Sequence, residues 1–295
     1  MRHRVGEGTG RPARGRPLTA VVTTSEAAIG KLVPEGTGLL AVGGMHMHNN
    51  PMELVREMVR QGRGARRLLT SPSGSIAADL LIGAGLVSEV ATSYIGFEHL
   101  GLAPCYRRAA ESGAVRVLEL CEAAIVHGLY AGAGGLPFVA LPAGLELSDV
   151  SSANREHFRT VTDPFTGERV LVAAALRPDV ALIHAQGADA RGNAIFAGAH
   201  FTDRLMAMAA RTVIVQVERL AEPGEVAAHP AESVLPGFLV TAVVLAPGGC
   251  LPTASHGAYG YDEPALRAYM KLARTEEGFA EYLRVAGMAP AEALA

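Results

Sequence analysis

Short apolar runs alternate with longer amphipathic stretches along the chain from residue 19 onward. In the clearest unit, the apolar run 39–42 ends in Gly43 and Gly44, and Pro51 then opens a helical stretch over 52–60. A continuous apolar run is typical of a strand buried on both faces, and proline favours the first turn of a helix. Repeated units of this kind predict an α/β fold with a single open mixed, mostly parallel sheet and helices on both faces.

The same pattern predicts the other elements. Further strands are expected at 67–70, 90–94, 115–118, 170–174, 180–183, 213–217 and 240–245. Further helices are expected to end near Gly83 and to cover 106–111, 122–130, 203–210, 263–274 and 276–284. The stretch 144–168 is rich in turn residues and is expected to cover or extend the sheet. An Arg-Gly-Asn turn within 189–193 predicts a hairpin that returns into Ile195.

The two ends of the chain differ in composition from the middle. Residues 1–18 hold five arginines among glycines and prolines and no apolar stretch, which predicts a disordered basic tail. We expect one domain over 19–285, followed by a flexible tail over 286–295.

Charge and cysteine content narrow the class of protein. The 295 residues include 26 lysines and arginines and 29 aspartates and glutamates, a formal net charge of −3, which gives no electrostatic surface for nucleic acid. The longest apolar runs are far shorter than the roughly 18 residues of a membrane-spanning helix, so no membrane association is expected. Three widely spaced cysteines form neither a disulfide framework nor a paired zinc motif, which favours a cytoplasmic protein.

Residues that directly follow the predicted strands are the first candidates for a site, because ligands of open α/β sheets bind beyond the carboxyl ends of the strands. These positions are Gly43, Gly44, the loop with Ser73 and Ser75, Glu98, Glu122, Gly134, Gly135, His184 and Glu218. Loops of this composition present backbone N–H groups to anions or carbonyl oxygens, although glycines also serve tight turns alone. For His184, a hydrogen-bonded structural role is preferred over that of a base.

Familiar catalytic motifs are absent from the sequence. It contains neither the glycine fingerprints of nucleotide-binding loops nor the G-x-S-x-G elbow of serine hydrolases. His46 and His48 follow the first predicted strand, as in a metal-dependent amidohydrolase, and His184 and His200 keep that alternative open. No lysine lies where it would bridge two metals, so solvent or loop histidines, and no metal, are expected.

Seven stretches carry a resemblance to a known family. They are PMELV at 51–55, ADLLIGAGLV at 78–87, SYIGFEHLGLAP at 93–104, AGAGGLPF at 131–138, DPFTGE at 163–168, ALRPDVALIHAQGADARGN at 175–193 and LPGFLVTAVVLAPGG at 235–249. Over about residues 20–284 the chain resembles the α (A) subunit of family I coenzyme A transferases, of the glutaconate CoA-transferase type. The fold implied is that family's, shared with certain sugar-phosphate isomerases.

The resemblance implies covalent catalysis by a glutamate that passes through a mixed anhydride and a glutamyl-CoA thioester. That glutamate belongs to a β subunit, in a Ser-Glu-Asn-Gly motif that this chain lacks, so the chain alone is expected to be inactive. The implied partners are the β subunit, in an αβ-based hetero-oligomer, an acyl-CoA and a carboxylic acid. Coenzyme A is expected as a substrate carrier, with no permanently bound cofactor.

The resemblance also assigns roles to candidate residues. Substrate binding is implied for Gly43, Gly44, Ser73, Ser75, Phe97, Glu98, Gly134 and Gly135. The last two are expected to offer backbone N–H groups to the tetrahedral intermediates.

Glu122 leaves the reaction open. In the related α subunit of steroid ring-cleaving CoA hydrolases, a glutamate at this place acts as the base, so the first alternative is a hydrolase with Glu122 as its catalytic residue. The plain interpretation is an acid favoured by the dipole at a helix N-terminus. A non-catalytic protein that binds acyl-CoA or another ligand is the second alternative.

Overall fold

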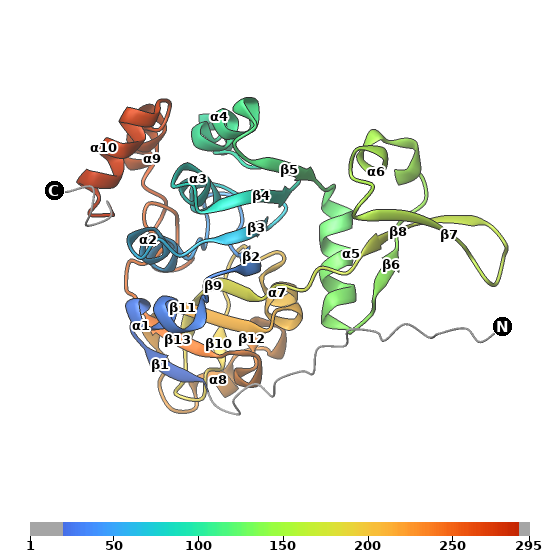
Figure 1. The fold of residues 1–295 in the computed structure, drawn as a ribbon. Coiled ribbons are helices and arrows are strands. Elements are labelled where there is room, and N and C mark those ends of the chain that lie inside the picture. Colours follow the sequence, from blue (N-terminus) through green and yellow to red (C-terminus); the bar gives the residue numbers. More distant parts are fainter. Residues whose placement is uncertain (1–19, 289–295) are drawn as a thin grey trace.

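The computed structural model describes residues 20–288, and its centre is one large sheet (Figure 1). Its strands are β1 (Val21–Thr23), β2 (Thr37–Val42), β3 (Ala65–Thr70), β4 (Val87–Thr92), β5 (Arg116–Glu119), β9 (Val180–Ala188), β10 (Ala194–Ile195), β11 (Thr212–Leu220), β12 (Val234–Leu235) and β13 (Ala242–Leu245). They run in the order β1-β13-β11-β9-β2-β3-β4-β5, all pairs parallel, while β10 pairs antiparallel with β9 and β12. The predicted fold class is confirmed, as is the hairpin through 189–193.

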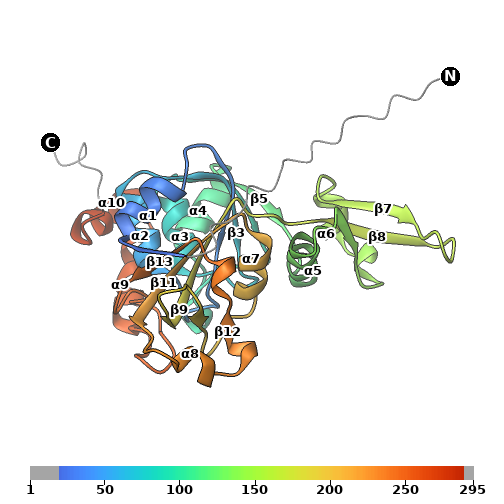
Figure 2. The same ribbon diagram turned by 90° about the horizontal axis from the view of Figure 1, so that it is seen from below.

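Helices cover both faces of this sheet. They are α1 (Ser25–Leu32), α2 (Met52–Arg60), α3 (Ile76–Gly83), α4 (Pro104–Ser112), α5 (Glu122–Ala133), α6 (Asp149–Ala153), α7 (Asp203–Ala209), α8 (Glu225–Ala228), α9 (Glu263–Leu272) and α10 (Glu276–Val285). Figure 2 shows α1 to α4 on one side of the sheet, with α9 and α10 beyond them, and α5 and α7 on the other.

The alternation of side chains along each strand builds two cores. In β2, Leu40 packs into the cluster under α1, α2 and α3, whereas Ala41 belongs to the cluster under α5 and α7. The neighbouring pair Leu68 and Leu69 in β3 divides in the same way. Because successive side chains of a strand point to opposite faces, each apolar run serves both layers, which is why these strands lack an alternating polar pattern.

A second sheet stands beyond α5 and was not predicted. It holds β6 (Phe138–Ala140), β8 (Arg169–Ala174) and β7 (Phe158–Thr162) in the order β6-β8-β7, all antiparallel. The strand predicted at 170–174 therefore exists, but it is the centre of this small sheet. The expectation that 144–168 covers or extends the main sheet was wrong, because β7 hydrogen-bonds to β8 instead.

The ends of the chain fall partly outside the description. The predicted tail at 1–18 and residues 289–295 lie outside the described residues, so the proposed domain limits stay predictions. Met288 is buried in the cluster that also contains Tyr269 and Phe279. No helix within 20–288 is long and apolar enough to cross a membrane.

Candidate active site

The carboxyl ends of β2, β3, β4 and β5 lie next to one another because these strands are neighbours and parallel. Gly43 and Gly44 follow β2, Ser73 and Ser75 follow β3, and Phe97 and Glu98 follow β4. Glu122, the first residue of α5, follows β5. Most of the predicted site residues therefore meet along one edge of the sheet.

Gly43 and Gly44 shape the loop over residues 43–50. A Cβ on Gly43 would lie 2.6 Å from Oδ1 of the buried Asp203, and Gly44 has a left-handed φ of 90°. The N–H of Gly43 donates to the Leu182 carbonyl and that of Gly44 to Asp203 Oδ1, both at 2.9 Å. Both N–H groups are engaged within the chain, so the two glycines bring the backbone close to Asp203.

Two other predicted residues support the site from behind. The Ser75 hydroxyl is buried and donates to the His46 carbonyl at 2.5 Å, while the Ser73 carbonyl accepts from the His46 N–H at 2.9 Å. Phe97 is completely buried, with its ring centroid 5.9 Å from that of Tyr269. Ser75 and Phe97 therefore hold their loops in place, and their predicted contact with substrate has no exposed surface to act through.

His46 and Glu98 meet at the centre of this edge. His46 Nδ1 and Glu98 Oε1 form an ion-pair contact, and the two side chains are 28% and 40% exposed. Both residues adopt left-handed backbone conformations, with φ of 51° and 53°. Such conformations are costly for residues other than glycine and concentrate at functional sites, so their occurrence in two contacting residues marks this pair as a candidate for chemistry.

Electrostatics at His46 favour the neutral imidazole. Burial lowers its pKa most, nearby His48 lowers it further, and the carboxylate of Glu122 partly opposes them. Glu122 itself is exposed, and its carboxylate has no ion-pair partner among residues 20–288. One basic nitrogen and two carboxylates therefore share one open edge.

Gly134 and Gly135 lie elsewhere. They follow the C-terminal end of α5, whose 12 residues separate them from Glu122 by about 18 Å at 1.5 Å per residue. The structure does not bring them to the carboxyl edge, so it gives no geometric basis for their predicted role as donors to an oxyanion.

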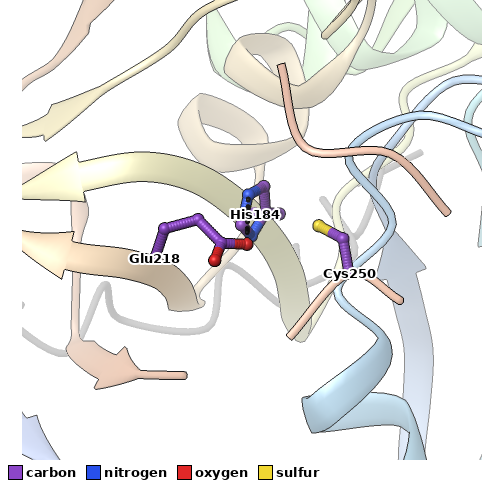
Figure 3. Close-up of side chains that lie close together, drawn as sticks. All are labelled: His184, Glu218 and Cys250. Carbon is purple, nitrogen blue, oxygen red and sulfur yellow. Dashed lines mark ion pairs between the residues drawn. The ribbon is translucent and has the colours of Figure 1, made fainter. Parts of the chain in front are cut away.

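Deeper under the same edge, His184, Glu218 and Cys250 approach one another (Figure 3). One ligand atom of each lies within 4.8 Å of the others, and this is the one such group found in the described part of the chain. His184 and Glu218 lie inside β9 and β11, because both strands continue past their predicted ends.

Hydrogen bonding explains this cluster without a metal. Gln216 Oε1 accepts from the N–H groups of Glu53 and Leu54, so its Nε2 donates to His184 Nδ1 at 3.2 Å. The proton of His184 then resides on Nε2, which lies 2.9 Å from Ser255 Oγ and has no lone pair for a metal. Burial, then Glu218, raises the pKa of the Cys250 thiol well above its usual value. These residues do not fit a metal centre as they stand, and His184 has the structural role expected of it.

The histidines of the amidohydrolase alternative are also dispersed. His48 is exposed and packs its ring edge-on against Tyr261, at 6.2 Å between centroids, whereas His200 stacks on Phe196 and pairs with Asp203. His46 faces Glu98 instead. Sequence reasoning considered His46 only as a metal ligand and missed its pairing with Glu98, although its place directly after a strand was a usable signal.

Comparisons with known proteins give one family. The coenzyme A transferase family matches residues 22–246. The A subunit of the 3-oxoadipate CoA-transferase of Pseudomonas knackmussii is 33% identical, over 90% of this chain and 94% of its own. The cholesterol ring-cleaving hydrolase IpdA subunit of Rhodococcus jostii is also 33% identical, over 83% of this chain and 84% of its own. The chain spans 60% of the length of another relative, from Archaeoglobus fulgidus, at 33% identity over 92% of this chain.

Solved structures agree. The glutaconate CoA-transferase of Acidaminococcus fermentans superposes with a TM-score of 0.83 and 30% identity, over 90% of this chain and 88% of that one. A variant of the decarboxylase AibA/AibB gives a TM-score of 0.81 and 34% identity, over 92% of this chain and 100% of that one. Relatives of similar identity thus have names from three different reactions.

Proposed function

Because the chain belongs to the coenzyme A transferase family, we propose that it works as the α (A) subunit of a two-chain enzyme that moves CoA from an acyl-CoA to a carboxylic acid. The resemblance predicted from the motifs is confirmed by this family match and by relatives that are named as A subunits of CoA-transferases. The match over 94% of the 3-oxoadipate CoA-transferase relative supports a subunit of the same extent, which has a β partner.

The observation that carries the proposal is the open edge with His46, Glu98 and Glu122. It is partly exposed on this chain, and a second subunit placed over it would exclude water from the reacting groups. The three cysteines offer no alternative nucleophile at this edge, since Cys105 and Cys250 are buried and Cys121 caps α5. The nucleophile is therefore assigned to the partner.

The proposed reaction balances without a proton. A glutamate carboxylate of the partner attacks the thioester carbonyl carbon, and CoA thiolate leaves a mixed anhydride. The thiolate then attacks the glutamyl carbonyl, which releases the donor carboxylate and leaves CoA on the glutamate. The same steps in reverse pass CoA to the acceptor. In this scheme Glu98 and Glu122 line the acyl pocket opposite the nucleophile and select among acyl groups by charge.

A hydrolase with Glu122 as base is the second candidate. Its support is the exposed carboxylate of Glu122, which lies near His46 and is free of ion pairs in the described chain, together with the named hydrolase relative. In this alternative Glu122 removes a proton from water or from the acyl-CoA, and the partner carries no CoA adduct.

Co-expression with the adjacent reading frame, followed by mass spectrometry after exposure to an acyl-CoA panel, tests both candidates. CoA attached to a partner glutamate, with acyl transfer to an added carboxylate, supports the transferase. Turnover that needs only water, without an adduct and abolished by Glu122→Gln, supports the second candidate. A chain that purifies alone and binds acyl-CoA without turnover contradicts both and supports the binding protein.

A further inference from the structure

His46 is built as an oriented base. Its Nδ1 is the buried ring nitrogen and faces Glu98, so a neutral imidazole places its proton there and leaves a lone pair on Nε2. The exposed 28% of the side chain belongs to the opposite side of the ring, which carries Nε2. A carboxylate on one nitrogen and an accepting nitrogen on the other is the arrangement by which carboxylate–histidine pairs activate a hydroxyl or water.

The backbone fixes this orientation at a cost. His46 is held by three hydrogen bonds: its N–H donates to the Ser73 carbonyl at 2.9 Å, and its carbonyl accepts from Ser75 Oγ at 2.5 Å and Asn50 Nδ2 at 2.9 Å. These bonds keep a left-handed conformation that a simple loop would relax. Glu98 reaches the ring from an equally strained position.

Exchange of CoA between two carboxylates gives such a base nothing to do, because no proton moves. Hydrolysis does require one, since a water molecule must lose a proton as it attacks. We propose that this site also uses water as the acceptor, and that His46, oriented by Glu98, is the base of an acyl-CoA hydrolase activity. The inference rests on the proposed two-chain enzyme.

The step balances as follows. Water oxygen bonds to the thioester carbonyl carbon while its proton passes to His46 Nε2, and Glu98 stabilises the imidazolium. The carbon–sulfur bond then breaks, and the CoA thiolate takes the proton from His46. The products are the free acid and CoA, and the base is regenerated.

The experiment uses the αβ complex, with acetyl-CoA and succinyl-CoA as probes, in ¹⁸O-labelled water with and without an acceptor carboxylate. Hydrolysis places one ¹⁸O in the released acid, whereas transfer through the partner glutamate leaves the released acid unlabelled. We expect His46→Gln to lower labelling by about 100-fold or more, the usual contribution of a general base. His48→Gln, the matched control on an exposed neighbour, retains it.

The pH dependence separates a base from a merely structural residue. The groups facing His46 are Glu98, Tyr94, Glu122 and His48. Because Glu122 raises and His48 lowers the pKa of His46, the acid limb of hydrolysis should move to lower pH in Glu122→Gln and to higher pH in His48→Gln. Glu98→Gln, which keeps a group of the same size beside Nδ1, should lower the rate while the complex stays intact.

Each outcome decides. Transfer without labelling in the unmodified complex overturns this inference and leaves the transferase standing, and so does labelling that survives His46→Gln or acid limbs that move in the same direction. Absence of both transfer and labelling overturns the proposed function itself.

Discussion

Replacing Gly43 by alanine tests whether the close approach of the 43–50 loop to Asp203 fixes the candidate site. The new Cβ would lie 2.6 Å from Asp203 Oδ1, 0.8 Å short of an ordinary contact of 3.4 Å. Asp203 has no room to retreat, because it is completely buried, accepts the Gly44 N–H at 2.9 Å and pairs with His200 at 3.1 Å. Either the loop moves or the hydrogen bond breaks.

The expected cost follows from those two terms. Loss of a hydrogen bond to a buried charged acceptor costs about 1.5–3 kcal/mol, and overpacking adds about 1–3 kcal/mol. We therefore expect Gly43→Ala to lower the free energy of unfolding by about 3–5 kcal/mol, a large share of the stability of an ordinary domain. The main contribution is the steric contact, because φ of Gly43 is outside the left-handed region.

Urea titration of the purified αβ complex measures this loss, with Gly260→Ala as the control, because a Cβ on Gly260 meets nothing within 4 Å. The control should change stability by less than about 0.5 kcal/mol. Combining Gly43→Ala with Asp203→Ala should cost less than the two single changes added, since removal of the carboxylate removes the clash. Additive costs, or a loss below about 1 kcal/mol for Gly43→Ala, would refute the reasoning.

Three further outcomes are expected. Tyr259→Phe should destabilise the protein by about 1–3 kcal/mol in urea titration, because the Tyr259 hydroxyl donates to Glu218 and accepts from the Cys250 N–H, which would be left buried and unpaired; an unchanged midpoint would contradict this. Burial lowers the pKa of His184 to about 3 and that of His157 to about 4, so both contribute stability above pH 6.5 that is progressively lost as the pH falls from 6.5 toward 3. His157→Gln should therefore flatten part of the fall in urea midpoint between pH 6.5 and 4, and an unchanged slope would exclude His157 as a cause. Because His184 carries its proton on Nε2, chelator treatment should leave the melting temperature unchanged and added zinc should not raise it; a rise with zinc that Cys250→Ser abolishes would show that the cluster does bind metal.

Local pattern was sufficient for most of the elements. The apolar run 39–42 and the proline that opens α2 fixed the first unit, because buried parallel strands and helix starts have local signatures. The same signature misled at 170–174, because it identifies a strand but not the sheet that it joins. That choice depends on β6 and β7, whose exposed and irregular residues have no comparable periodicity.

For the site, strand ends were predictable and contacts were not. Glu98 and Glu122 were found because parallel strands bring their carboxyl ends together. Gly134 and Gly135 were misplaced, because a helix longer than expected carries them away from that edge. His46 was known only as a loop histidine, since its pairing with Glu98 depends on two left-handed residues that the sequence pattern does not mark.

The strand order also sets a timetable for the growing chain. β2 lies at the centre of the sheet between β3 and β9, and its register pairs Leu40 with Val180, 140 residues later. At about 5–20 residues per second, the ribosome needs about 7–28 s to supply that partner. Until then the nascent polypeptide carries a half-sheet whose inner strand is bare on one edge. The same central pairing that closes the finished molecule thus leaves the emerging one dependent on chaperones, and a cut between the two halves would expose apolar strands on both pieces.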